Sequence, residues 1–188
     1  MRVSREQVAE NRRRILEAAG RLFRERGFGA VTVAEVMKAA GLTHGGFYGY
    51  FGSKDELIAA ALEDLVVAPV PKPVTLEAYA DRYLTPEHMA DCAGGCPVAA
   101  LGTDAGRQSP QARAAMTEGL RLQIARLGEG AGGERNATAR QAAIGSWAAM
   151  VGAMILARMS DDPALAQQVL QETRAFIGQR VGDEPGEI

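Results

Sequence analysis

The stretch GLTHGGFYGYFGSK, residues 41–54, places five glycines and four aromatic residues in fourteen positions. Dense glycine is typical of a turn or of a loop that lies against a phosphate, whereas clustered aromatic side chains are typical of a core. The segments on either side of this stretch indicate how one short element can have both properties.

The segment before it, residues 5–26, predicts an amphipathic helix, because its apolar residues recur at spacings of three and four. Gly27 suits the left-handed end of such a helix, and Phe28 is then expected to return to the core as an apolar anchor. The apolar residues of the helix are Val8, Ile15, Leu16, Ala18, Ala19, Leu22 and Phe23.

Hydroxyl side chains mark the next three helix starts, and glycines mark the stops. The predicted caps are Thr32 with Glu35 before residues 33–40, Thr43 before 44–50, and Ser53 with Glu56 before 54–67. Two short helices joined by a turn with glycine form a helix-turn-helix unit, which presents its second helix to the major groove of DNA. Residues 43–50 are therefore the predicted recognition helix, and Gly41 supplies the turn.

This recognition helix has two predicted faces. Phe47 and Phe51 face the core, while Gly45 and Gly46 let the backbone approach a phosphate or a base edge, at about 1 kcal/mol of helix propensity each. The predicted hydrogen-bond donors to DNA are Thr43, His44, Tyr48, Tyr50 and Lys54.

Charge is unevenly distributed along the 188 residues. Residues 1–54 carry ten Lys and Arg against five Asp and Glu, whereas the remainder carries eleven against eighteen. A basic segment on an acidic body is expected of a protein that meets a polyanion at one end. An arginine-rich helix face that is merely solvated explains the same numbers, so charge alone leaves both interpretations open.

The stretch GFGAVTVAEVMKAAGLTHGGFYGYFGSKDELI, with its Tyr-x-x-Phe-x-x-Lys spacing, resembles the DNA-binding domain of the tetracycline-repressor (TetR) family of bacterial regulators. The resemblance covers about residues 9–68. It implies an all-α fold in which three helices bind DNA, a fourth connects to a ligand-binding and dimerisation body, and two chains bind a palindromic operator. By position, it implies DNA contacts from Thr32, Thr43, His44, Gly45, Gly46, Tyr48, Tyr50 and Lys54. His44 and Tyr50 depart from the family's commoner Lys and His.

The predicted domain division follows from this resemblance. Residues 1–53 form the helix-turn-helix domain, residues 53–67 the linking helix, and residues 68–188 the regulatory and dimerisation domain. Three prolines in residues 68–74 are expected to make a stiff loop. Short helices are predicted within residues 75–91, a longer one over 110–128, and a flexible GEGAGGE segment after it.

Cys92 and Cys96 are too close in sequence to staple the fold, and a single Cys-x3-Cys is a poor zinc site. Pro97 is suited to the first position of a helix, which would place Cys96 at a helix N-terminus where the dipole favours a thiolate. The pair could sense oxidants or electrophiles, with Cys92 as the resolving thiol, or could simply be buried small hydrophobes.

The last two predicted helices, residues 137–160 and 163–181, are expected to form a four-helix bundle with those of a second copy. The first of them could instead be the core of a monomer. An effector pocket between the helices would be lined by Tyr79, Met89, Met116, Trp147, Met150 and Met154. A methionine stripe at helical spacing is also what an ordinary core contains.

The predicted function is sequence-specific DNA binding for transcriptional regulation, as a ligand- or thiol-responsive repressor. We expect a cytoplasmic homodimer that binds double-stranded operator DNA and an unknown small-molecule effector, needs no cofactor or metal, and does not contact a membrane. Only two histidines occur, His44 and His88, and no catalytic triad or metal cluster is visible, which disfavours an enzyme. A thiol peroxidase using the two cysteines and a purely structural helical module were the alternatives.

Overall fold

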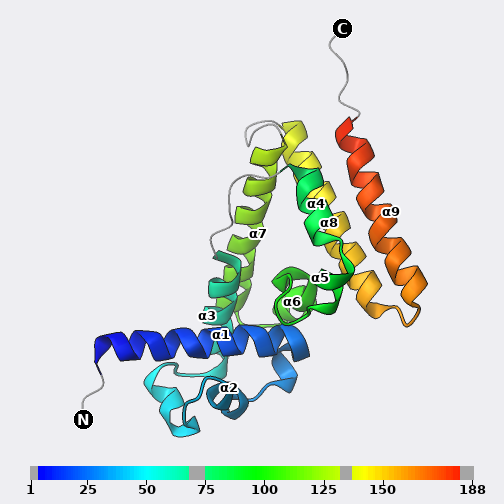
Figure 1. The fold of residues 1–188 in the computed structure, drawn as a ribbon. Helices are drawn as coiled ribbons and strands as arrows, with labels where there is room; N and C mark the ends of the chain where they lie inside the picture. The colour runs from blue at the N-terminus through cyan, green and yellow to red at the C-terminus, as the bar shows by residue number, and fades with distance from the viewer. Residues whose placement is uncertain (1–3, 68–74, 132–136, 183–188) are drawn as a thin grey trace. The chain divides into compact units, whose positions relative to one another are not determined.

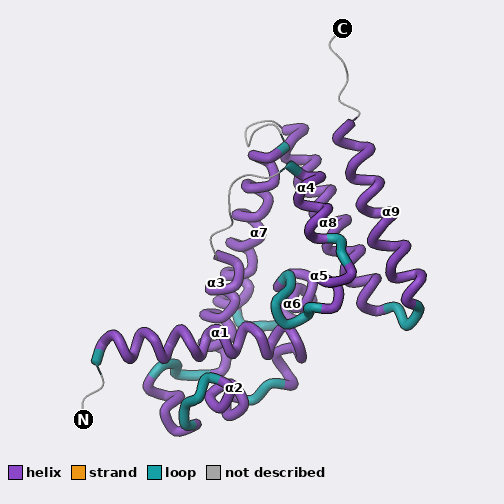
Figure 2. Tube along the Cα trace, in the orientation of Figure 1, coloured by secondary structure: helices purple, strands orange, loops and turns teal. Residues whose placement is uncertain are grey.

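The computed structural model describes residues 4–67, 75–131 and 137–182. Within these ranges the chain is helical and contains no strand (Figures 1 and 2), which confirms the predicted all-α fold. The predicted proline loop at residues 68–74 lies outside the described residues, as does the end of the tail. Two compact units are present: residues 1–68 with 93–119, and residues 69–92 with 120–188.

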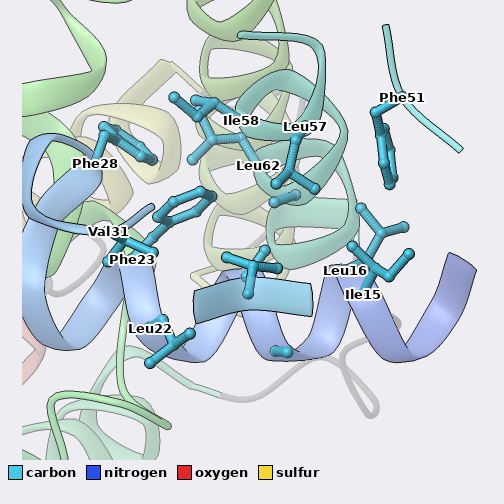
Figure 3. Packing of buried hydrophobic residues seen from close by; sticks show 14 of the residues in the cluster. Ile15, Leu16, Leu22, Phe23, Phe28, Val31, Phe51, Leu57, Ile58 and Leu62 are labelled. Atoms are coloured by element: carbon cyan, nitrogen blue, oxygen red, sulfur yellow. The ribbon is translucent and has the colours of Figure 1, made fainter. Parts of the chain in front are cut away.

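The first unit begins with α1 (Arg5–Ala30), which Ser4 caps through its side chain. Gly27 interrupts the helical geometry with φ 78°, and the turn brings Phe28 edge-on against Phe23, with ring centroids 5.1 Å apart. Figure 3 shows this pair in the core with Leu57 and Leu62. The predicted break at Gly27 and the return of Phe28 to the core are therefore confirmed. Three further residues, up to Ala30, are still assigned to α1 after the kink.

The helix-turn-helix comprises α2 (Val33–Ala39) and the short helix η1 (His44–Gly49). The left-handed Gly41, with φ 69°, ends α2 in a Schellman motif: the Leu42 amide donates to the Met37 carbonyl at 2.8 Å, and the Gly41 amide donates to the Lys38 carbonyl at 3.0 Å. The turn that the sequence predicted at Gly41 is thus present with its expected backbone geometry.

The predicted recognition helix differs in type from an α-helix, because η1 is a 3-10 helix. Three of its six residues are glycine, which has the poorest helix propensity apart from proline, and 3-10 geometry is common in such short pieces. Thr43 precedes it but makes no side-chain capping hydrogen bond, so the predicted capping role of Thr43 is wrong.

Helix α3 (Lys54–Val67) follows, and α6 (Pro97–Ala105) and the first half of α7 (Pro110–Gly130) complete the first unit. The Ser53 hydroxyl accepts from the Glu56 amide as predicted, whereas the Glu56 carboxylate accepts from the Gly52 amide rather than from Ser53. A Cβ at position 119 would overlap Val66, so the glycine permits close approach of α7 to α3.

The second unit contains α4 (Leu76–Tyr83), α5 (Pro86–Ala90), the end of α7, α8 (Ala137–Met159) and α9 (Pro163–Gly182). Thr75 and Thr85 cap α4 and α5 through their hydroxyls. Helix α7 continues through Gly130, so the prediction of a flexible segment was wrong for residues 128–130; residues 132–136 lie outside the described part. By length and composition alone, α8 could cross a membrane. The core helices of soluble proteins have the same length and composition, so this property is weak evidence for a membrane span.

Candidate nucleic-acid interface

The inner face of η1 is held on the first unit by two aromatic rings. Phe47 and Phe51 are both buried and their rings stack with centroids 5.8 Å apart. The guanidinium of Arg12, from α1, lies 5.1 Å from the centroid of the Phe51 ring. These contacts confirm that the two phenylalanines are core residues and fix one side of the helix, so that the other side is presented outward.

The outer face of η1 is exposed and small. Tyr48 is 74% exposed although its ring also packs edge-on against Phe47. His44 and Gly45 are exposed as well, and a Cβ added at Gly45 would meet nothing within 4 Å. No atom among the described residues therefore requires glycine at position 45, which fits a surface shaped for contact with another molecule.

Tyr50, a predicted DNA contact, is half-buried and bonded within the unit. Its hydroxyl accepts a hydrogen bond of 2.8 Å from Nδ2 of Asn11, and Oδ1 of Asn11 accepts one of 3.0 Å from Nε2 of Gln7. Sequence reasoning missed both partners. A signal was available, because Asn11 lies four residues before Ile15 and so on the buried stripe of α1.

Lys54, another predicted contact, has its ammonium 2.6 Å from the backbone carbonyl oxygen of Phe28. This bond connects the start of α3 to the segment after the α1 kink. It uses one of the three ammonium protons, so two remain for other acceptors. The lysine therefore has a structural partner in addition to its predicted role on DNA.

Thr32 is exposed, and its side chain serves the N-terminus of α2. The hydroxyl accepts from the Glu35 amide at 3.2 Å and donates to Oε2 of Glu35 at 2.7 Å, while the Thr32 amide donates to the same oxygen at 2.8 Å. These bonds to Thr32, and then the ion pair with Arg26, lower the pKa of Glu35 from 4.5 to about 2. The predicted capping box is confirmed, and the DNA contact of Thr32 stays a prediction.

One exposed cation near η1 was missed by sequence reasoning. Lys38 lies in the last turn of α2 and is exposed. By contrast, Arg13 is paired with Glu10 at 2.7 Å and with Glu17 at 3.4 Å on the surface of α1. A lysine near the end of the first helix of a helix-turn-helix is suited to a phosphate contact.

The first unit also contains an open groove of about 740 Å³ beside α3 and the start of α7. Its floor includes Ala59, Ala60, Ala114 and Ala115, and its charged lining is mostly acidic: Asp55, Glu56, Glu63 and Glu118, with Arg12 the one basic residue. None of the six residues of the predicted effector pocket lines this groove.

Five of those six residues lie in the second unit, and Met116 lies in the first. Trp147, Met150 and Met154 are buried on α8. Tyr79 stacks on Tyr83 with centroids 5.7 Å apart, and Met89 is half-buried. The three residues on α8 therefore have the environment of core residues, and the pocket itself stays a prediction.

Cys92 and Cys96 are both half-buried free thiols, and Cys96 occupies the N-cap position of α6, with Pro97 at the first helical position as predicted. Backbone carbonyls before Cys92 and directly after it accept hydrogen bonds from arginine side chains. In the first unit, Nε of Arg24 donates to the Ala93 carbonyl at 2.6 Å. In the second, Arg158 donates to the carbonyls of His88 and Met89 at 2.9 and 3.0 Å. Within the described ranges no three His, Cys, Asp or Glu residues are grouped as metal ligands would be.

The geometry of the first unit defines an all-helical protein with an N-terminal helix-turn-helix. Residues 15–61 match the family model of the bacterial regulatory proteins of the tetR family. Residues 15–61 are therefore a DNA-binding domain of this family, as the sequence resemblance predicted.

Curated relatives match mainly over the same domain. The HTH-type transcriptional regulator TtgR of Pseudomonas putida is 40% identical over 65 residues, which are 35% of this chain and 31% of TtgR. The regulator AcrR of Shigella flexneri is 36% identical over 62 residues, 33% of this chain and 29% of AcrR. The matched segment thus spans about a third of the length of these two relatives.

Solved structures resemble the chain over nearly its whole length. A TetR regulator from Legionella pneumophila has a TM-score of 0.70 at 20% identity and covers 96% of this chain and 99% of its own. The reduced form of E. coli NemR has a TM-score of 0.66 at 23% identity, covering 90% and 96%. At these identities the likeness establishes the fold of the C-terminal part and no more.

Loss of the α2 cap should be measurable as stability that depends on pH. We expect Thr32→Ala to lower the free energy of unfolding by about 1 kcal/mol near neutral pH, as at other N-caps. Because folding lowers the pKa of Glu35, this carboxylate stabilises the native state above pH 4.5 and loses that effect as the pH falls toward about 2. The difference between wild type and Thr32→Ala in denaturant unfolding should therefore shrink over that window.

Thr117→Ala is the matched control, since Thr117 is an exposed helical threonine whose hydroxyl donates to the Arg113 carbonyl and caps nothing. Equal stabilities of wild type and Thr32→Ala near neutral pH would contradict the capping role.

Proposed function

We propose that the protein is a DNA-binding transcriptional regulator, a repressor that acts as a homodimer on a palindromic operator and is released by a small-molecule effector or by thiol oxidation. The proposal rests on the placement of η1, the second helix of the helix-turn-helix. Phe47 and Phe51 hold η1 on the core, and its outer face is exposed. The family match falls on this unit.

An enzyme is less well supported. The relatives named above are regulators, and the features that would indicate chemistry, the two cysteines, also suit a sensor. Consumption of peroxide beyond one equivalent, with a thiol donor, would distinguish turnover from sensing. The relatives' role as DNA-binding regulators also supports a cytoplasmic location.

Regulation would work through a population shift. Two recognition helices of a dimer bind successive major grooves only when they are about 34 Å apart. An effector that binds better to a conformation with another spacing would lower the population that fits the operator. Trp147, Met150 and Met154, with Tyr79 and Met89 of the same unit, remain the proposed apolar lining for such an effector, whereas Met116 lies in the first unit.

DNA binding can be tested through Tyr48. We expect Tyr48→Ala to weaken binding about tenfold, because it removes a hydroxyl and an aromatic surface at the proposed interface. The measurement is a mobility-shift titration with duplex DNA from the gene's own upstream region, searched first for an inverted repeat. Since tyrosine is uncharged, the salt dependence should stay unchanged.

Tyr48→Phe is the matched variant, which keeps the ring against Phe47 and loses only the hydroxyl. Wild-type affinity in Tyr48→Ala, with an unchanged melting temperature, would count against η1 as the recognition helix.

Dimerisation is supported by apolar side chains that α8 and α9 leave exposed. Met159 lies on the face of α8 opposite its buried residues, and Ile144 and Leu156 flank that face on its two sides. Leu165 and Phe176 are eleven residues apart on α9 and so share one face. Two exposed apolar faces on neighbouring helices fit a four-helix bundle with a second copy.

Charge placed in this interface should separate the two chains. Leu156, which is 57% exposed, can be changed to Glu with little effect on the fold of one chain. We expect sedimentation equilibrium to give the mass of two chains for wild type, and dimer affinity at least about tenfold weaker for Leu156→Glu, because burying an unpaired carboxylate is costly. Thr117→Glu, an exposed substitution elsewhere, should stay dimeric. A monomeric wild type at micromolar concentration would contradict the proposal.

Thiol sensing is supported by how the segment around the cysteines is anchored. Arg24 connects Ala93 to α1, which also carries the core face of the DNA-binding domain, and Arg158 holds the segment before Cys92. A disulfide between Cys96 and Cys92 would rearrange this segment. Forming the disulfide from two thiols releases two electrons and two protons. An azo oxidant such as diamide takes up both and is thereby reduced to the hydrazine.

We expect diamide to lower the operator affinity of the wild type at least about tenfold, in the usual range of allosteric coupling, with recovery after reduction by dithiothreitol. Cys96→Ser should keep its affinity in diamide. The assay is a fluorescence anisotropy titration with labelled duplex. Equal responses of wild type and Cys96→Ser would end the thiol proposal and leave small-molecule release in place.

A further inference from the structure

Asn11 is exceptional in the packing of the first unit. Among the described residues it is the one buried side chain that is polar, at 8% exposure, and it lies on the apolar stripe of α1. A buried amide is costly unless its polar atoms are hydrogen-bonded, so its partners indicate what it does. Those partners are Gln7, one turn earlier on α1, and Tyr50, which follows η1 directly and is 39 residues away in sequence.

The two hydrogen bonds have a direction. Nε2 of Gln7 donates to Oδ1 of Asn11 at 3.0 Å, and Nδ2 of Asn11 donates to the Tyr50 hydroxyl at 2.8 Å. Since an amide nitrogen cannot accept, the Tyr50 oxygen must be the acceptor of this bond. Its own proton is then left to donate, and within the described residues the Tyr50 hydroxyl makes no second hydrogen bond.

We propose that Asn11 is a positioning residue that fixes the Tyr50 hydroxyl as a hydrogen-bond donor to a DNA phosphate. The inference rests on the proposed function and deepens it by assigning a group and a partner at the end of the recognition helix. The hydrogen bonds would then run in one direction, from Gln7 to Asn11, from Asn11 to Tyr50 and from Tyr50 to the phosphate. In such a chain each bond polarises the next.

The chemistry of the hydroxyl favours phosphate over a base edge. A hydroxyl whose oxygen already accepts from Asn11 is used as a donor, and phosphate oxygens are acceptors only. Tyr50 is also half-buried, whereas Tyr48 and His44 on the outer face of η1 are exposed and better placed for base edges. Phosphate contacts from such flanking side chains fix the orientation of a protein on the duplex without reading its sequence.

The first experiment is a double-mutant cycle with Tyr50→Phe, Asn11→Ala and both together. The probes are a duplex that the wild type selects from a randomised library and an unrelated duplex at low salt. We expect Tyr50→Phe to weaken binding to both duplexes about tenfold, in line with loss of a hydrogen bond to a charged group. Asn11→Ala should weaken binding less, and the double variant should bind within about twofold of Tyr50→Phe, because both remove one interaction. The salt slope should not change, since no cation is lost.

The second experiment reverses the central hydrogen bond while keeping its geometry. In Asn11→Asp the carboxylate can only accept, so the Tyr50 proton turns inward and is lost to the DNA, while Gln7 keeps its partner. We expect Asn11→Asp to weaken binding at least as much as Tyr50→Phe. The double variant with Asn11→Asp and Tyr50→Phe, compared with Tyr50→Phe alone, measures the effect of the new charge on binding. This effect is subtracted from the loss of affinity seen in Asn11→Asp. Because this variant keeps both hydrogen bonds, it tests the proposal even where Asn11→Ala unfolds.

Different outcomes would contradict the roles assigned to Asn11 and Tyr50 and the proposed DNA binding itself. Additive losses in the cycle, wild-type binding by Asn11→Asp after the charge correction, or a loss confined to the selected duplex would overturn the assignment of Asn11 and Tyr50 and leave DNA binding intact. Absence of binding by the wild type to either duplex would overturn the proposed function and this inference with it.

Discussion

Burial of Phe47 and Phe51 is the contact on which the rest of the DNA-binding domain depends. Half of η1 is glycine, so the helix has little intrinsic stability, and its geometry comes from the two stacked rings that enter the core of the first unit. With this inner face fixed, Gly45, Tyr48 and Gly49 are exposed, and a Cβ at either glycine would meet no atom of the described residues. Dense glycine and clustered aromatic residues in one stretch are thus the two faces of one element.

The polar residues around η1 support its placement before they bind anything. Thr32 and Glu35 cap α2, Lys54 connects α3 to the Phe28 carbonyl, and Asn11 from α1 orients Tyr50. Each of these side chains has a partner within the domain, and for Lys54 and Tyr50 donor protons are left over for a ligand. A rigid frame of this kind holds donors in place before DNA arrives, so little ordering is needed on binding.

Local patterns in the sequence predicted what local physics decides. The caps Thr32 and Ser53 located two helix starts, although Thr43 caps nothing, and the sequence pattern identified Phe28, Phe47 and Phe51 as core. The 3-10 form of η1 was missed because helix type in so short a segment depends on how its two ends are held. The partners of Tyr50 and Lys54 were missed because they are 39 and 26 residues away, and pairing across that distance is set by tertiary packing. The dimer stays a proposal that rests on the exposed apolar side chains of α8 and α9, because its contacts would be made between two chains.

The central claim is that the outer face of η1 is the surface that meets DNA. It is tested most directly by following backbone amide resonances of the full-length protein as duplex DNA from the gene's upstream region is added. We expect the largest shifts at Gly45, Gly46 and Tyr48 and in the neighbouring turn at Gly41, with small shifts along α4 and α5. Large shifts confined to the second unit, with η1 unchanged, would contradict it.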